Sequence, residues 1–326
     1  MLHIIGIIAF ILFIFFLLFS ASQISKSKKS TVKSGKKAAV AFLIFVIAAY
    51  LSVNYSGSTL DIADMVQQSP NEYADNFMEV HFIDVGQGDA ALIRIPGNKF
   101  ILIDGGQPKY GPYIVNYMKQ LGVKELSYLI ITHPHIDHIG GLEDVVLSFP
   151  INEIYMPRVI HSTKTFESLL ESIRSKGMKI KQAKSGVKLI LGEDVEGIFL
   201  APEHGKTYEN LNDYSAVLKI TYDGKSILFT GDAEKISEKE MLNNQRDVKA
   251  DVLKVGHHGS NTSTTEDFLE AVSPEYAVIS SGKGNDYGHP HKETLERLDN
   301  KGVTILRTDI NGTIILKIAG GKIQFQ

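Results

Sequence analysis

The chain has 326 residues, of which 44% are hydrophobic and 22% are charged, and its formal net charge is −3. This length allows one large domain or two ordinary ones, and the composition is ordinary for a globular protein. Cysteine is absent, which excludes disulfides, thiolate metal ligands and cysteine nucleophiles.

Two apolar runs near the N-terminus predict a membrane anchor. Residues 2–19 and 38–55 are almost wholly apolar, and each has about the shortest length that spans a bilayer as a helix. Residues 20–37 between them carry six lysines and no acidic residue. By the positive-inside rule this basic loop stays in the cytoplasm and both ends of the chain face outward. We therefore expect a multi-pass protein of the cell membrane with an extracytoplasmic C-terminal part.

A cleavable signal peptide is the alternative for the first apolar run. That run lacks a basic start, however, and a signal peptide would leave the second run unexplained. Topology and anionic lipid account for the basic loop, so membrane lipid is the partner expected for the N-terminal helices. Residues 56–77 are polar and acidic, contain Pro70 and Asn71 as breakers, and are predicted to form a linker.

From residue 78 to 326, short β runs alternate with amphipathic helices. Strands are expected at 78–84, 90–95, 99–104, 126–132, 195–200, 216–222, 225–230, 251–255, 276–280, 303–307, 313–318 and 322–325. Helices are expected at 110–121, 141–148, 164–176, 234–243, 265–271 and 292–300. This mixed order predicts an α/β domain in which two sheets pack face to face and helices cover them outside. Polar side chains at strand ends would then converge at one edge of the sandwich.

The densest group of potential metal ligands lies in residues 132–138, Thr-His-Pro-His-Ile-Asp-His, directly after an apolar strand. His133 and His135 are two residues apart and can reach one ion from a tight loop, whereas Asp137 and His138 point towards a second. A His-x-His pair alone rarely binds metal. The added Asp-His pair and the glycines that follow it favour a two-metal hydrolase site.

Three other predicted strands also end in an acid or a histidine, namely Asp104, Asp232 and His257. Taken singly, each is more often a turn, cap or hydrogen-bonded loop residue. Together they occur in the order and setting that a dinuclear site requires, and Asp232 could bridge two cations because each carboxylate oxygen can bind one.

The histidine run, Asp232 and His257 resemble the metallo-β-lactamase superfamily, and the resemblance covers residues 78–326. It implies a four-layer αββα sandwich with a pair of metal ions at one edge. More narrowly, residues 82–90 (Phe-Ile-Asp-Val-Gly-Gln-Gly-Asp-Ala), 257–260 (His-His-Gly-Ser) and 287–291 (Tyr-Gly-His-Pro-His) resemble the soluble metallo-hydrolase domain of the ComEC competence family. The large DNA-channel domain of that family has no counterpart here, so a transport role does not follow.

The resemblance implies two ligand sets, which are His133, His135 and Asp232 for one ion and Asp137, His138, His257 and Asp232 for the other. The superfamily usually adds a mid-chain histidine to the first ion. Here the corresponding segment is the ComEC-type Asn212–Ser215, and the nearby His204 does not occupy the matching motif. The expected cofactors are two divalent ions, Zn²⁺ or Mn²⁺, because a more oxygen-rich first site suits Mn²⁺ at least as well.

Asp137 and His289 are the predicted catalytic residues. Two cations lower the pKa of a bridging water and neutralise a phosphoryl oxygen. His289, in a Gly-His-Pro loop, is then a candidate to stabilise the oxyanion or to protonate the leaving group. Asp104 is expected to orient a ligating histidine. Six further residues are expected to shape or support the site: Asp84, Asp89, Asn212, Ser215, His258 and His291.

The leading functional hypothesis is a membrane-anchored phosphodiesterase or nuclease, with single-stranded DNA among its candidate substrates and no obligate protein partner. Residues 78–326 carry 28 basic and 33 acidic side chains. This balance is not that of a strong DNA binder, so small phosphodiesters remain candidate substrates. One alternative is hydrolysis of a carboxylic ester, lactone or β-lactam. Another is a non-catalytic binding module, which the retained ligand set disfavours.

Overall fold

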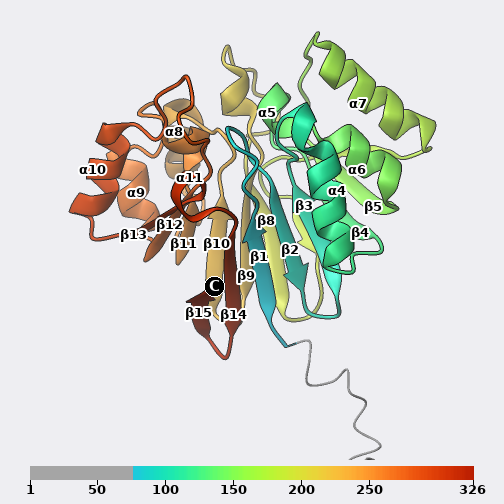
Figure 1. Cartoon of the computed structure of the whole chain (residues 1–326). Helices are drawn as coiled ribbons and strands as arrows, with labels where there is room; N and C mark the ends of the chain where they lie inside the picture. The colour runs from blue at the N-terminus through green and yellow to red at the C-terminus, as the bar shows by residue number, and fades with distance from the viewer. Residues whose placement is uncertain (1–75) are drawn as a thin grey trace, which may run out of the picture. The chain divides into compact units, whose positions relative to one another are not determined.

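The computed structural model describes residues 76–326 (Figure 1). The membrane helices, the basic loop and nearly all of the linker expected from the sequence lie outside these residues, so the anchor and its topology stay predictions. Within the described part of the chain, no helix is both long enough and apolar enough to cross a membrane.

The domain contains two sheets, of eight and seven strands. The first sheet runs in the order β15 (Lys322–Phe325), β14 (Ile314–Ala319), β1 (Met78–Phe82), β2 (Ala91–Ile95), β3 (Lys99–Ile103), β4 (Leu126–Ile130), β5 (Ile151–Met156) and β6 (Ile180–Gln182). The second runs in the order β13 (Thr304–Arg307), β12 (Tyr276–Ile279), β11 (Val252–Lys254), β10 (Lys225–Phe229), β9 (Val217–Tyr222), β8 (Val195–Ala201) and β7 (Lys188–Ile190).

Helices cover the outer faces of both sheets, one group on each side of the sandwich in Figure 1. Beside the first sheet lie α4 (Gly111–Gln120), α6 (Leu142–Ser148) and α7 (Lys164–Ser175), and beside the second lie α8 (Lys235–Asn243), α9 (Glu266–Val272) and α10 (Lys292–Asn300). The connections contain short helical turns, which are η1 (Pro108–Tyr110), α5 (Ile136–Ile139), η2 (Leu211–Tyr214), η3 (Gly256–Gly259) and α11 (Thr308–Asn311).

Three layers of buried apolar side chains hold these four layers of backbone together. Between the sheets, Phe82 stacks on Phe229 with ring centroids 5.9 Å apart. A second layer joins the first sheet to α4, α6 and α7, and a third joins the second sheet to α8, α9 and α10. The alternating buried residues of β14 show why these segments form strands: one face turns inward while the other meets solvent or helices. The expected two-sheet sandwich with outer helices is confirmed.

Strand direction explains why the polar side chains meet. The strands β3 and β4 are parallel neighbours in the first sheet, and β10, β11 and β12 are parallel neighbours in the second. The carboxyl ends of parallel strands lie at the same edge, where loop residues are free of the ladder and can face a ligand. The residues that follow these strands include Asp104, the 132–138 run, Asp232 and the 257–258 pair.

Candidate metal centre

The histidine run begins with an anchored threonine. Thr132 follows β4, and both its backbone N–H and its hydroxyl donate hydrogen bonds to the carboxylate of Asp104, at 2.8 and 2.5 Å. Asp104 also lies 2.8 Å from Nδ1 of His138, and all three side chains are buried. A carboxylate in contact with Nδ1 fixes the proton there and leaves Nε2 free to bind a cation.

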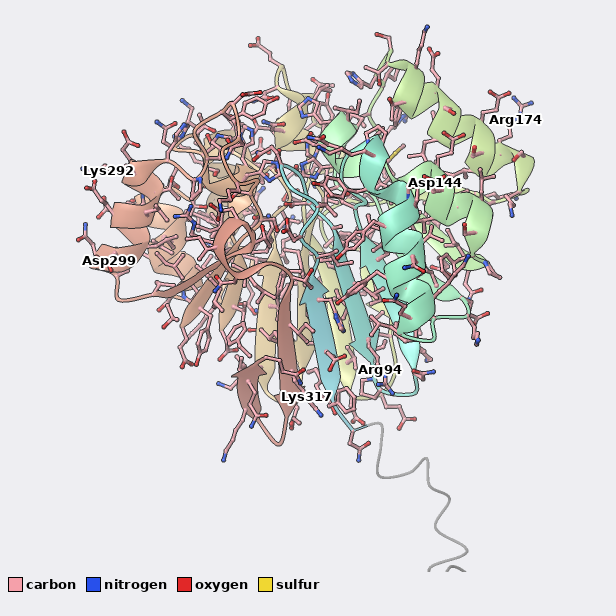
Figure 2. All side chains as sticks on the ribbon, in the orientation of Figure 1. Arg94, Asp144, Arg174, Lys292, Asp299 and Lys317 are labelled. Atoms are coloured by element: carbon pink, nitrogen blue, oxygen red, sulfur yellow. The ribbon has the colours of Figure 1, made fainter. Side chains whose placement is uncertain are left out.

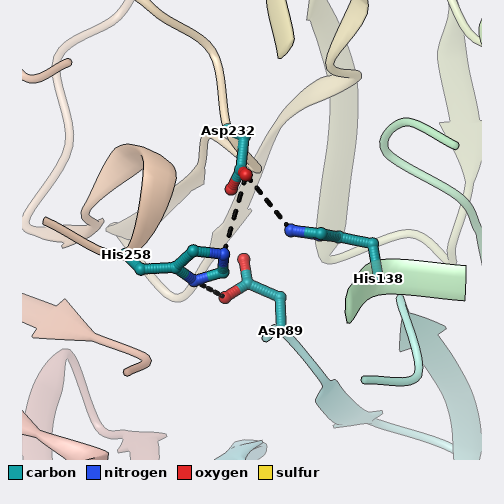
Figure 3. A group of neighbouring side chains, drawn as sticks. All are labelled: Asp89, His138, Asp232 and His258. Atoms are coloured by element: carbon teal, nitrogen blue, oxygen red, sulfur yellow. Dashed lines mark ion pairs between the residues drawn. The ribbon is translucent and has the colours of Figure 1, made fainter. Parts of the chain in front are cut away.

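Asp232 lies at the centre of the cluster. Its Oδ2 atom is 3.3 Å from Nε2 of His138 and 3.6 Å from Nε2 of both His258 and His133. Figure 3 shows His138 and His258 approaching this carboxylate from two sides. The backbone N–H of Asp232 donates to the hydroxyl of Ser215 at 3.1 Å, which fixes the carboxylate at the end of β10.

Two groups of potential metal ligands share Asp232. One consists of Asp89, His138, Asp232 and His258, and the other of His133, His135 and Asp232. Within each group, one ligand atom per residue lies within 4.8 Å of the others. A carboxylate common to two adjacent groups is the arrangement of a dinuclear site, because its two oxygens can face two ions.

Unpaired buried atoms test whether a cation fits this cluster. Among the described residues, four side-chain atoms of the first group are buried without a hydrogen-bond partner: Nε2 of His138, Nε2 of His258, Oδ1 of Asp232 and Oδ1 of Asp89. Three of them face an ion-pair partner at 3.3 Å without forming a hydrogen bond: Nε2 of His138 faces Asp232, Nε2 of His258 faces Asp137, and Oδ1 of Asp89 faces His258. Buried polar atoms that gather without hydrogen bonds can be satisfied by a cation held between them. All four are imidazole nitrogens or carboxylate oxygens, which are common ligand atoms for divalent metals, so the residues fit a divalent ion.

The structure places His258, rather than the expected His257, in the second ligand group. Both histidines have positive φ, at +47° and +55°, and lie in the turn η3. His258 is buried, and its Nδ1 lies 3.0 Å from the carbonyl of Ser280, which leaves Nε2 for the cluster. The side chain of His257 is 24% exposed, and its Nε2 is 3.8 Å from Asp232. Its Nδ1 instead contacts Glu234 at 2.9 Å.

Asp89, expected only to shape the site, reaches the same group. Its Oδ1 lies 3.3 Å from Nδ1 of His258, and its Oδ2 forms a 2.8 Å ion pair with Lys254. Both members of this pair are almost wholly buried. Because an unpaired buried carboxylate is unfavourable, Lys254 explains how Asp89 can remain charged beside Asp232.

Asp137 stands at the more exposed side of the cluster, with Oδ2 3.3 Å from Nε2 of His258 and its side chain 23% exposed. It belongs to neither of the two groups of ligand atoms. Its backbone carbonyl accepts a hydrogen bond of 3.2 Å from the N–H of Asp89. The backbone at Gly88 lies so close to Asp137 that a Cβ atom on Gly88 would be 2.3 Å from that carbonyl oxygen.

The electrostatics of the cluster favour positive charge. Burial alone would raise the pKa of Asp232, but the charges of His138, His258 and His133 outweigh it and hold that pKa well below the usual range. Burial would lower the pKa of His258, yet Asp232, Asp137 and Asp89 together raise it to about 10. Burial and the charge of His138 hold the pKa of His133 well below its usual range, and the charges of Asp232 and Asp137 only partly oppose this. A site that stabilises buried cationic groups also stabilises a bound cation.

His289 lies beside the cluster. Its ring centroid is 5.3 Å from that of His257 and 6.2 Å from that of His258. Burial and the neighbouring histidines lower its pKa to about 4. The amide of Gln87 is oriented by the N–H of Gly282, which donates to its Oε1, so the Nε2 amide group faces Nδ1 of His289 at 3.4 Å.

The other predicted residues support the loops. Asp84 accepts a hydrogen bond from the N–H of Gly86 at 3.0 Å, and His291 accepts one from the N–H of Asn261 at 3.0 Å. Asn212 donates to Glu234 at 3.0 Å and so holds the carboxylate that contacts His257.

Two further histidines, His204 and His161, lie outside both ligand groups. Nδ1 of His204 lies 3.4 Å from the amine of Lys184. His161, which drew no attention in the sequence, lies after β5 with its ring centroid 6.1 Å from that of His135. Only its place after a strand of the first sheet could have singled it out.

Comparison with known proteins identifies the family. Residues 83–283 match the family described as the metallo-beta-lactamase superfamily. The chain belongs to this superfamily. The two-sheet domain and the ligand groups at its edge are therefore those of a metallo-β-lactamase-fold hydrolase family.

Three relatives within this superfamily bear competence or recombination names. The chain is 36% identical to ComE operon protein 3 of Bacillus subtilis, over 72% of the chain and 32% of that protein. It is 32% identical to competence protein ComA of Neisseria gonorrhoeae, over 82% of the chain and 36% of that protein. It is 30% identical to recombination protein 2 of Haemophilus influenzae, over 76% and 30% respectively. The expected relation to ComEC competence proteins is confirmed, and the chain spans about a third of the length of these relatives.

Proposed function

We propose that this metallo-β-lactamase superfamily member is a metal-dependent phosphodiesterase that cleaves nucleic acid. The observation that carries the proposal is the pair of ligand groups sharing Asp232, with His289 beside them. Two divalent ions held by these groups would activate a water for attack and neutralise a phosphoryl oxygen. A diester of phosphate carries its charge on that oxygen, which is what a cation pair is suited to stabilise.

Neighbouring residues of the chain orient the two histidines of the first ligand group. Asp104 holds Nδ1 of His138, and the carbonyl of Ser280 holds Nδ1 of His258, so both rings present Nε2 to the cluster. Asp137, at the more exposed side, can accept a hydrogen bond from an attacking water and orient it.

His289 is suited to hydrogen bonding with an oxygen of the substrate. Because Gln87 donates to its Nδ1, the proton of the neutral ring lies on Nε2. A neutral imidazole with an Nε2–H group donates a hydrogen bond to developing negative charge. This role favours oxyanion stabilisation over delivery of a proton to the leaving group.

Metal-loaded full-length protein should hydrolyse bis-p-nitrophenyl phosphate and a single-stranded DNA oligonucleotide. Asp232→Asn should lower kcat at least about 100-fold, because it removes the charge shared by both ligand groups. Asp299→Asn is the matched control, since this exposed residue lies on the outer helix α10 (Figure 2). Absence of turnover on both phosphodiesters, with hydrolysis of a lactone or β-lactam instead, would overturn the proposal.

We also propose that the domain is anchored in the cell membrane and faces outward. The support is the two apolar runs and the lysine-rich segment between them. Protease added to intact cells should digest the domain, and a cytoplasmic marker should survive. Protection of the domain under these conditions would refute the outward orientation.

A further inference from the structure

The loop between β12 and α10 is unusually well fixed for an exposed segment. Asn285 is its centre: the side-chain amide donates to the carbonyls of Gly282 and His289, at 2.9 and 2.5 Å. Its Oδ1 accepts from the N–H groups of Tyr287 and His289, at 3.1 and 3.0 Å. His291 adds a 3.2 Å contact from Nε2 to the carbonyl of Tyr287. The backbone around Tyr287 is thus held from both sides.

This fixed loop presents an aromatic ring next to the metal centre. The side chain of Tyr287 is 67% exposed. Its ring stacks on that of His289, with centroids 5.7 Å apart and planes 22° from parallel. His289 in turn lies 6.2 Å from His258, so a continuous row of rings leads from the surface to the ligand group.

A single exposed tyrosine needs no explanation by itself, since isolated apolar groups are common on protein surfaces. Tyr287 differs because hydrogen bonds fix its backbone and because its ring stacks on a residue of the site. Little conformational entropy remains to be lost when another flat group stacks on it. Stacking of a nucleobase on an aromatic side chain contributes roughly 1–3 kcal/mol.

We propose that Tyr287 is a stacking platform for a nucleobase next to the scissile phosphate, so that the substrate is single-stranded nucleic acid. This inference rests on the proposed phosphodiesterase function and adds the substrate class. In a duplex the bases already stack on one another and their faces are covered, whereas a single strand offers a free face. A small alkyl phosphodiester offers no flat face at all.

The charge of the domain supports recognition through the base. With 28 basic and 33 acidic side chains in residues 78–326, the domain does not attract a polyanion by its overall charge. Affinity that came from neutralising phosphates would fall steeply with salt. Affinity that comes from stacking should change little with salt, and this difference can be measured.

The test compares an oligothymidylate with an abasic chain of the same length, both fluorescein-labelled and with phosphorothioate linkages to slow hydrolysis. Fluorescence anisotropy with the metal-loaded full-length protein should show that the thymidine chain binds about tenfold more tightly. Tyr287→Ala should bind both chains with the weaker affinity, and Tyr287→Trp should keep the preference. Tyr113→Ala, which removes a 43% exposed tyrosine on α4, is the matched control.

Two results would overturn the platform: equal binding of both chains by the wild type, or a preference that survives in Tyr287→Ala. Because binding is read without hydrolysis, a protein that prefers the thymidine chain but cleaves no diester would refute the proposed function alone. A protein that hydrolyses bis-p-nitrophenyl phosphate but binds both chains equally would refute the platform alone.

Discussion

The buried carboxylates of the site differ in what they face. Asp104 faces donors only, namely the N–H and hydroxyl of Thr132 and Nδ1 of His138. Asp232 faces Nε2 atoms of histidines, and its Oδ1 has no hydrogen-bond partner in the described chain. The first residue therefore orients a ligand, whereas the second is itself suited to hold a cation.

Replacement of Asp104 tests whether this residue orients His138 for metal binding. In Asp104→Asn the side-chain N–H₂ group would face a donor, so His138 would lose the contact that fixes its Nδ1 proton. We expect the affinity for the divalent ion to fall about 10- to 100-fold. Competition with a chromophoric chelator measures this affinity, and Asp299→Asn should behave as the wild type. An unchanged affinity would show that His138 is oriented by something else.

Among the local elements, the turn after β11 decides which histidine reaches the metal centre. Two consecutive non-glycine residues with positive φ are rare, and this geometry turns His258 inward and leaves His257 beside Glu234. We therefore expect His258→Ala to lower the metal content from two ions per chain towards one, whereas His257→Ala should retain two. Elemental analysis of the purified variants measures this content. The reverse pattern would restore the assignment made from the sequence.

The Gly-Gln-Gly loop gives a second prediction at this scale. Gly88 has φ of +143°, and an added Cβ would lie 2.3 Å from the carbonyl of Asp137. Gly88→Ala should therefore destabilise the fold by about 2 kcal/mol more than Gly97→Ala. Gly97 is the matched control, because it also has positive φ but has no atom within 4 Å of the added Cβ. Urea unfolding of both variants measures the difference, and equal losses would contradict the close approach.

The elements also show what a sequence can and cannot predict. Strands such as β1 and β14 were predictable because their apolar residues follow a clear pattern. The three-residue edge strands β6 and β7 were missed because so short a segment carries no periodicity. The six-residue strand β5 was missed because its apolar and polar residues do not alternate. Asp104 and Asp232 stood out at strand ends, but the choice between His257 and His258 depends on φ angles that no pattern reveals.

At the scale of the whole molecule, layer packing makes stability depend on a histidine that belongs to neither ligand group. His81 on β1 is buried against α4, with Nδ1 2.7 Å from the hydroxyl of Tyr117 and Nε2 2.8 Å from Glu79. Burial lowers its pKa from 6.5, and the contact with Glu79 only partly opposes this. The folded protein therefore binds this proton less readily than the unfolded chain does.

The sign of the effect on stability follows from this difference in proton binding. Well above pH 6.5 neither state is protonated at His81, and its contribution to the free energy of unfolding is fully present. As the pH falls from 6.5 through the lowered pKa, the unfolded chain takes up the proton first and that contribution is lost. The wild type should thus lose more stability between pH 8 and pH 5 than His81→Gln, which keeps a polar group beside Tyr117. Urea unfolding of both proteins at pH 8, 6.5 and 5 measures the two slopes. Parallel slopes would show that His81 titrates alike in the folded and unfolded states, because every other titrating group is common to both proteins.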